Sequence, residues 1–244
     1  MPTNLRIAMW SGPRNVSTAL LRSFGSRADT VVCDEPLYAH YLRQTGAPHP
    51  GADEIQRRHE ADWRAVARWL TGPAPGGKRV FYQKHMAHHL LPEVDRAWLD
   101  ELSHAFLIRE PRAMLASLCE VVPRPGLCDT GLPQQLELFE RLRSANGRPP
   151  PVVDSADLLR DPAGLLGRLC ETLGLPFDPA MLSWDPGPRD TDGCWAEHWY
   201  ATVLESTGFA PYRPSTKSLP TSLEPLADAC EQIYAQLYEH RLTT

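Results

Sequence analysis

The chain has 244 residues, enough for one sizeable domain with a substantial hydrophobic core. Its 25 basic and 30 acidic residues give a formal net charge of −5, which argues against a nucleic-acid partner, because such partners are bound by a clustered basic surplus. No apolar window approaches the length of a transmembrane helix, so no membrane partner is expected either.

The cysteines indicate a reducing compartment. All six are scattered along the chain, without the C-x-x-C spacing of zinc sites or dithiol centres. The apolar run at the start of the sequence is too short for a signal peptide. We therefore expect reduced cysteines and a cytoplasmic location.

The first two dozen residues hold the most informative pattern. Residues 5–10 form a short apolar run suited to a buried strand, and a tight turn follows at 11–13. Ser17 and Thr18 then precede the apolar pattern of a helix. A strand, a turn and a helix N-terminus make a phosphate cradle, because the free N–H groups of the first turn and the helix dipole attract anions. Arg14 adds a planar fork of donors, although an ordinary capped strand-helix unit would show much of the same pattern.

Strands and helices alternate along the rest of the chain. Short apolar runs predict strands at 30–33, 79–84, 104–109 and 151–154. Helical periodicity and start signals predict helices at 54–70, 98–102, 111–121, 134–144, 161–173, 195–204 and 223–242. This order predicts an α/β fold with a mostly parallel central sheet of about five strands flanked by helices.

Polar residues follow four of the predicted strands. Arg14 comes after the first strand, Glu35 after the second, Lys84 and His85 at the end of the third, and Arg109 at the end of the fourth. In parallel sheets ligands bind beyond the carboxyl ends of the strands, so we expect these side chains at one edge of the sheet.

A second anion site is indicated around Arg109. Ser117 lies eight residues further on, in the helix that follows the strand, so an arginine and a hydroxyl could grip a phosphate together. Taken alone, the pair does not specify a phosphate site, because arginines often end strands and helical serines are usually surface or packing residues.

Together these segments resemble the sulfotransferase family, which uses 3′-phosphoadenosine 5′-phosphosulfate. Residues 11–18 look like its first motif, residues 108–117 look like its second, and residues 157–177 look like its third shared block. The resemblance implies the P-loop-like sulfotransferase fold, which we expect as a single domain over 1–244 with a closing helical segment at about 193–244.

The resemblance also implies roles for individual residues. The donor's 5′-phosphosulfate would be bound by the first motif, which contains Arg14, Asn15, Val16, Ser17 and Thr18. Its 3′-phosphate would be held by Arg109 and Ser117, and Lys84 would contact the leaving oxygen. The expected reaction moves a sulfuryl group to a hydroxyl or amine of a small-molecule acceptor, leaving 3′-phosphoadenosine 5′-phosphate, without a metal. The family's late basic loop is not found, and residues 212–217 are the nearest basic candidate.

Two residues compete as the base that takes the acceptor's proton. Glu35 stands where some bacterial-type members place a glutamate base, but a glutamate needs its pKa raised by burial. His85 lies beside Lys84, and an unperturbed histidine titrates near neutrality. Both are retained. Among the histidines at 85, 88 and 89, the H-x-x-H pair lacks a third ligand of clear spacing, so no metal site is expected.

Four further interpretations concern activity, pocket and assembly. A P-loop kinase of a small molecule is one alternative, disfavoured because the G-x-x-x-x-G-K-[ST] pattern is missing. A non-catalytic nucleotide-binding or interaction protein on the same fold is another. The aromatics Trp195, Trp199 and Tyr200 are expected in the core more than in an acceptor pocket. The oligomeric state is left open, with a homodimer as one option.

Overall fold

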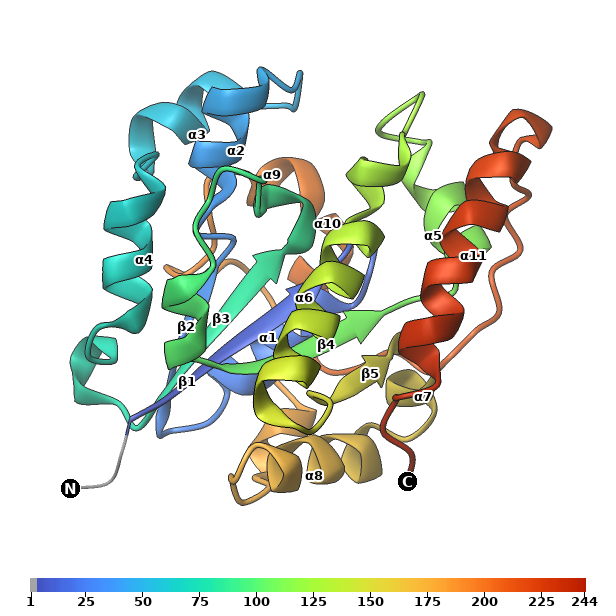
Figure 1. The fold of residues 1–244 in the computed structure, drawn as a ribbon. Helices are drawn as coiled ribbons and strands as arrows, with labels where there is room; N and C mark the ends of the chain where they lie inside the picture. Colours follow the sequence, from blue (N-terminus) through green and yellow to red (C-terminus); the bar gives the residue numbers. More distant parts are fainter. Residues whose placement is uncertain (1–3) are drawn as a thin grey trace. The chain divides into compact units, whose positions relative to one another are not determined.

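A five-stranded sheet runs through the fold. The structure is a computed structural model that describes residues 4–244, and its strand order is β2-β3-β1-β4-β5 (Figure 1). β2 pairs with β3, and β4 with β5, in parallel. The predicted α/β class, a parallel sheet flanked by helices, is therefore confirmed.

The strands are β1 (Leu5–Ser11), β2 (Thr30–Asp34), β3 (Val80–Met86), β4 (Ser103–Ile108) and β5 (Val152–Asp154). The α-helices are α1 (Ser17–Gly25), α2 (Tyr38–Thr45), α3 (Ala52–Arg58), α4 (Trp63–Thr71), α5 (Pro111–Leu118), α6 (Leu132–Asn146), α7 (Ser155–Arg160), α8 (Pro162–Thr172), α9 (Ala196–Trp199), α10 (Ala201–Leu204) and α11 (Glu224–Tyr238). Short 3₁₀ helices are η1 (Pro75–Gly77), η2 (Ala87–His89), η3 (Ala97–Glu101), η4 (Leu127–Thr130), η5 (Pro179–Leu182) and η6 (Thr221–Leu223).

The chain divides into two compact units, which are described separately. Unit 1 comprises residues up to Met9, Ser17–His104 and Asp178–Phe209. Unit 2 comprises Trp10–Val16, Ala105–Phe177 and Ala210–Thr244. The single domain over 1–244 stays a prediction.

The core of unit 1 forms where α1 packs on β2 and β3. Phe24 of α1 stacks on Tyr82 of β3 with ring centroids 4.2 Å apart. All seven residues of β3 are buried, including Lys84 and His85. The strand expected at 79–84 therefore extends two residues further than its apolar run indicated, and it includes His85.

Three predicted helices differ in type or continuity from the observed elements, and the one predicted at 98–102 is the 3₁₀ helix η3. The helix predicted at 54–70 is interrupted, because His59 is extended and Asp62 starts α4 by accepting a hydrogen bond from the Arg64 amide at 3.1 Å. The helix predicted at 195–204 consists of two single turns, α9 and α10. A 3.6-residue periodicity does not by itself show where a helix is interrupted.

Unit 2 joins β4 and β5 to a group of helices in which α11 packs on α5 and α6. Tyr234 of α11 donates a hydrogen bond to Asp154 at the end of β5, 2.8 Å away. Arg112 of α5 forms ion pairs with three acidic residues of α11: Glu224, Asp228 and Glu231. Within the described residues, no helix is both long and apolar enough to cross a membrane.

Candidate functional site

The loop after β1 has a left-handed turn at its centre. Arg14 has a φ of 55°, a conformation unfavourable for a residue with a side chain. The neighbouring Asn15 stabilises the turn, because its amide donates to the Leu107 carbonyl at 3.1 Å and its side-chain oxygen accepts from the Val16 amide at 2.9 Å. The turn is therefore fixed to β4 within unit 2.

Gly12 allows the same loop to approach a second segment of unit 2. A Cβ at position 12 would lie 2.3 Å from the carbonyl oxygen of Thr130. That distance leaves no room for any side chain, so the glycine is required by close backbone contact and not by its dihedral angles.

Arg14 contacts both Ser117 and Arg109. The Nε of Arg14 donates to the Ser117 hydroxyl at 2.9 Å, and Arg109 donates to the backbone carbonyl of Arg14. Burial, and then the positive charge of Arg14, lower the pKa of Arg109. The structure therefore brings together the three residues that the sequence assigned to two phosphate groups.

This cluster has the chemistry of an anion site. Two guanidinium groups near each other in a partly buried place repel, and a bound anion relieves that repulsion. Guanidinium forks and a hydroxyl are also the donors that phosphate oxygens accept from. The residues present in unit 2 therefore fit a phosphate-bearing ligand.

Residues 212–217, the basic candidate from the late part of the sequence, also lie in unit 2. Lys217 pairs with Glu120, just beyond α5, at 2.6 Å, and the Arg160 guanidinium lies 4.2 Å from the centre of the Tyr212 ring. Contacts to Glu120 and Arg160 therefore hold both ends of residues 212–217 against unit 2. Tyr212 also interacts electrostatically with Arg109 and raises its pKa, against the larger effect of burial.

Helix α1 begins directly after the loop. Ser17 is its first residue and Thr18 its second, and the Ser17 side chain is buried. The first four N–H groups of a helix have no partner inside it, so the predicted helix N-terminus is at the predicted place. Anion binding there stays a prediction, as do the roles of Asn15 and Val16.

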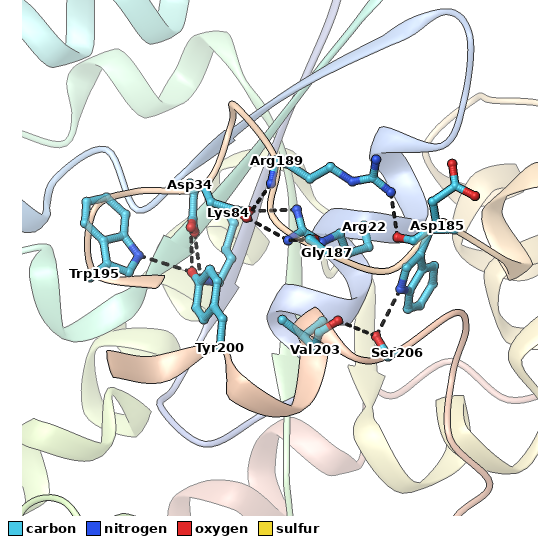
Figure 2. A network of polar contacts seen from close by, with 12 residues as sticks. Arg22, Asp34, Lys84, Asp185, Gly187, Arg189, Trp195, Tyr200, Val203 and Ser206 are labelled. Atoms are coloured by element: carbon cyan, nitrogen blue, oxygen red, sulfur yellow. Dashed lines mark hydrogen bonds and ion pairs between the residues drawn. The ribbon is translucent and has the colours of Figure 1, made fainter. Parts of the chain in front are cut away.

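A buried ion cluster in unit 1 contains Asp34, Glu35 and Lys84. The Lys84 ammonium lies 2.8 Å from Asp34 Oδ1 and 2.6 Å from Glu35 Oε1, and it donates to both. It also donates to the hydroxyl of Tyr200 at 2.7 Å (Figure 2). Burial alone would lower the pKa of Lys84, but Asp34 and Glu35 raise it well above its usual value. Lys84 is therefore a charged lysine.

Glu35 is a buried carboxylate with a raised pKa. Burial raises its pKa above the ordinary 4.5, although the positive charge of Lys84 opposes the shift. A raised pKa increases the proton affinity of a carboxylate and so improves it as a general base. Glu35 also has a left-handed backbone, with a φ of 42°, and its amide donates to the Lys84 carbonyl at 2.9 Å.

His85 lies in a different environment. It is 1% exposed, and its Nε2 lies 3.3 Å from the side-chain oxygen of Gln83. Burial, and then His104, lower its pKa to about 3. Adjacent residues of a strand point to opposite faces, so His85 does not share the face of Lys84. This geometry supports Glu35 more than His85 as the base, and both assignments remain predictions.

Two further histidines lie in an aromatic cluster of unit 1. His89 stacks on Tyr38 with centroids 4.5 Å apart, and His88 meets Tyr41 edge-on at 5.3 Å. Burial lowers the pKa of His88 to about 3 and that of His89 well below its usual value. Among the described residues no group of three or more histidine, cysteine or acidic side chains is arranged to hold a metal ion.

A buried ion pair fixes the loop that leads to Tyr200. Both terminal nitrogens of Arg22 on α1 lie 2.7 Å from the Asp192 carboxylate. Asp192 also accepts from the Arg189 amide at 2.8 Å. A cavity of about 940 Å³ lies beside this pair, lined by α1, β2 and residues 180–191. The sequence around Asp192 does not indicate this contact, because the ion pair joins positions 170 residues apart.

Comparisons with known proteins identify relatives over almost the whole chain. A family model described as "Sulfotransferase domain" matches residues 5–229. Two Arabidopsis thaliana proteins named branched-chain-amino-acid aminotransferase-like protein 1 and 2 are 36% and 35% identical over 234 residues. The match covers 96% of this chain but only 42% and 41% of those proteins, so the chain spans about two fifths of their length.

Solved structures share the fold at low sequence identity. The sulfotransferase domain of the Synechococcus PCC 7002 olefin synthase aligns with a TM-score of 0.59 and 18% identity, covering 99% of this chain and 96% of that one. A sulfotransferase from Alicyclobacillus acidocaldarius aligns with a TM-score of 0.56 and 15% identity, covering 99% and 98%. At such identities the likeness concerns the fold.

Proposed function

Because the chain belongs to the sulfotransferase domain family, we propose that it transfers a sulfuryl group from 3′-phosphoadenosine 5′-phosphosulfate to a hydroxyl or amine of a small-molecule acceptor. The observation that carries the choice of donor is the cluster of Arg14, Arg109 and Ser117. Two arginines that repel each other beside a hydroxyl suit a ligand with more than one phosphate-type group.

The donor assignment follows the two motifs. Arg14 and the backbone through Val16, with Ser17 and Thr18 at the start of α1, would bind the 5′-phosphosulfate. Arg109 and Ser117 would bind the 3′-phosphate. When bound, the donor supplies the SO₃ group, whose bond to a phosphate oxygen breaks as its bond to the acceptor's oxygen or nitrogen forms.

The unit 1 cluster supplies the acid-base chemistry. Glu35 takes the proton that the acceptor loses, and its raised pKa makes it effective in doing so. Lys84 provides positive charge for the negative charge that develops on the leaving oxygen. The proton taken by Glu35 passes to water after the reaction, so atoms and charge balance. His85 is the alternative base.

Nucleotide binding tests the donor. The melting temperature would be measured with and without 3′-phosphoadenosine 5′-phosphate, for the wild type and for Arg109→Ala. We expect stabilisation of the wild type and at most a small shift for Arg109→Ala, because a ligand raises stability according to its affinity. Arg148→Ala, a change at an exposed arginine of unit 2, is the matched control and should behave like the wild type. No shift for the wild type would refute the donor assignment.

Turnover tests the reaction. Donor labelled in its sulfur would be incubated with a cell metabolite extract, and labelled products would be separated by chromatography. A labelled product that needs Lys84 supports the proposal. Nucleotide binding without any transfer favours a non-catalytic nucleotide-binding protein, and stabilisation by ATP with magnesium in place of the bisphosphorylated nucleotide favours a kinase.

A further inference from the structure

The three protons of the Lys84 ammonium all have acceptors in the structure. A protonated lysine has three donors and no acceptor. Its Nζ lies 2.8 Å from Asp34 Oδ1, 2.6 Å from Glu35 Oε1 and 2.7 Å from the Tyr200 hydroxyl. A fourth acceptor could therefore be bound only if one of these three bonds is released.

The Tyr200 hydroxyl is itself fully bonded. It donates to Asp34 Oδ2 at 2.5 Å, and it accepts from Lys84 and from Trp195 Nε1, the latter at 3.1 Å (Figure 2). Asp34, Lys84 and Tyr200 thus form a closed triangle of hydrogen bonds inside unit 1. Trp195 and Tyr200 belong to a hydrophobic cluster with α2, which holds the ring in place.

The three partners of Lys84 differ in exposure. The side chain of Asp34 is 1% exposed and Tyr200 is 4% exposed as a whole residue, whereas 11% of the Glu35 side chain is exposed. Asp34 and Tyr200 also bind each other, and Glu35 has neither of them as a hydrogen-bond partner among the contacts described. The bond to Glu35 is therefore the one that can open without breaking the triangle.

We propose that Tyr200 is a positioning residue. Together with Asp34, it holds the Lys84 ammonium in place while the bond from Lys84 to Glu35 is exchanged for a bond to the leaving oxygen. This inference rests on the proposed function in assigning a reacting oxygen to Lys84. Tyr200 acts through Lys84 and does not touch the substrates.

Tyr200→Phe removes only the hydroxyl and keeps the ring. It leaves one Lys84 proton without its acceptor and Asp34 Oδ2 without its donor, so the triangle opens. Tyr82→Phe is the matched control, because Tyr82 lies two residues before Lys84, is fully buried, and has a hydroxyl with no hydrogen-bond partner in the described part of the chain.

Lysine acylation followed by mass spectrometry tests the positioning without any acceptor. The chain has three lysines, and exposed Lys78 and Lys217 serve as internal references for Lys84. In the wild type and Tyr82→Phe, Lys84 should react far more slowly than Lys78. In Tyr200→Phe the acylation rate of Lys84 relative to Lys78 should rise about three- to tenfold. The loss of one hydrogen bond makes the Lys84 amine available to the reagent more often by about this factor. A Tyr200→Phe rate equal to that of Tyr82→Phe would overturn the proposal.

Kinetics give the second readout. Tyr200→Phe should lower kcat about 10- to 100-fold while the acceptor KM and the affinity for 3′-phosphoadenosine 5′-phosphate change by less than about twofold, because only the placement of Lys84 is disturbed. An equal loss of nucleotide affinity would indicate general structural damage and overturn the assignment. If Tyr200→Phe does not fold, Trp195→Phe, which removes one donor to the Tyr200 hydroxyl, must show a smaller rise in Lys84 acylation, and no rise overturns the proposal.

The two proposals can fail separately. If no acceptor is ever sulfated but Lys84 acylation rises in Tyr200→Phe, the sulfuryl transfer is wrong and the positioning of Lys84 stands. If transfer occurs and Tyr200→Phe matches Tyr82→Phe in both readouts, the reaction stands and the role of Tyr200 is wrong.

Discussion

The Nε of Arg14 donates to the Ser117 hydroxyl across 2.9 Å, although 103 positions separate the two residues. Ser117 is 7% exposed, so this bond orients the guanidinium from inside unit 2. Ser117→Ala should therefore weaken binding of 3′-phosphoadenosine 5′-phosphate about 3- to 10-fold, the effect of one hydrogen bond of about 0.5–1.5 kcal/mol. Isothermal titration calorimetry measures it, with the exposed Ser144→Ala as control. Unchanged affinity in Ser117→Ala would remove the residue from the donor site.

Gly12→Ala should destabilise the fold, although it adds only one methyl group. The added Cβ would lie 2.3 Å from the Thr130 carbonyl oxygen, so either the loop or η4 must move. We expect a loss of about 1–3 kcal/mol in the free energy of unfolding, as for an overpacked position, together with weaker nucleotide binding. Chemical denaturation measures the first effect. Gly126→Ala is the control, since its Cβ would meet only Asp129 Oδ2 at 3.6 Å, and equal stability of the two variants would contradict the prediction.

The identity of the base can be decided from pH profiles. Glu35 has a pKa raised above 4.5, and a base must be ionised, so kcat should fall as the pH drops through the Glu35 pKa. Glu35→Gln should lower kcat about 10²- to 10⁴-fold and remove this acidic limb. His85→Gln should keep the limb, because the His85 pKa of about 3 places its titration below the range of the limb.

Two controls accompany that experiment. Glu101→Gln, at an exposed carboxylate of unit 1, should match the wild type, and the nucleotide affinity of every variant reports whether the fold is intact. A His85→Gln variant that binds nucleotide normally yet loses the acidic limb would establish His85 as the base instead.

Several parts of this arrangement could be predicted from the sequence. The strand-turn-helix at 5–24 and the Arg109-to-Ser117 spacing are local patterns, and local patterns determine where the chain leaves a strand and enters a helix. The sequence predicts Lys84 at the end of a strand, and the structure places it two residues before the end of β3. The prediction is nearly right because a lysine that closes an apolar run is typical of a strand end. The run underestimated β3 by two residues, since a buried strand can hold a paired lysine and a neutral histidine.

The contacts of Tyr200 could not be predicted in the same way. The hydroxyl bonds to Lys84 across 116 positions, and nothing in the neighbouring sequence indicates that partner. An aromatic group at 195–200 is usual in a hydrophobic core, and the Tyr200 ring does pack in one. The aromatic pattern does not indicate that a buried lysine and an aspartate bind the hydroxyl of that ring.

Acid should destabilise the fold through its buried histidines. The unfolded chain protonates histidine near pH 6.5, whereas His88 in the folded protein does so only near 3. Its contribution is therefore fully present above pH 6.5 and is lost as the pH falls from 6.5 towards 3, at about 1.4 kcal/mol per pH unit. His88→Phe keeps an aromatic ring beside Tyr41 and should reduce that slope. Denaturation at several pH values measures it, with exposed His198→Gln as control; identical slopes would contradict the assignment.

The left-handed backbone at Arg14 and Glu35 has a consequence for relatives of this chain. These are the two residues other than glycine with positive φ in the described part of the protein, and each conformation is unfavourable by about 1–2 kcal/mol. Selection for folding alone would place glycine or asparagine at both positions. Lineages that keep the fold without the proposed reaction are therefore expected to drift to those residues, whereas lineages that carry it out should retain side chains that the backbone disfavours.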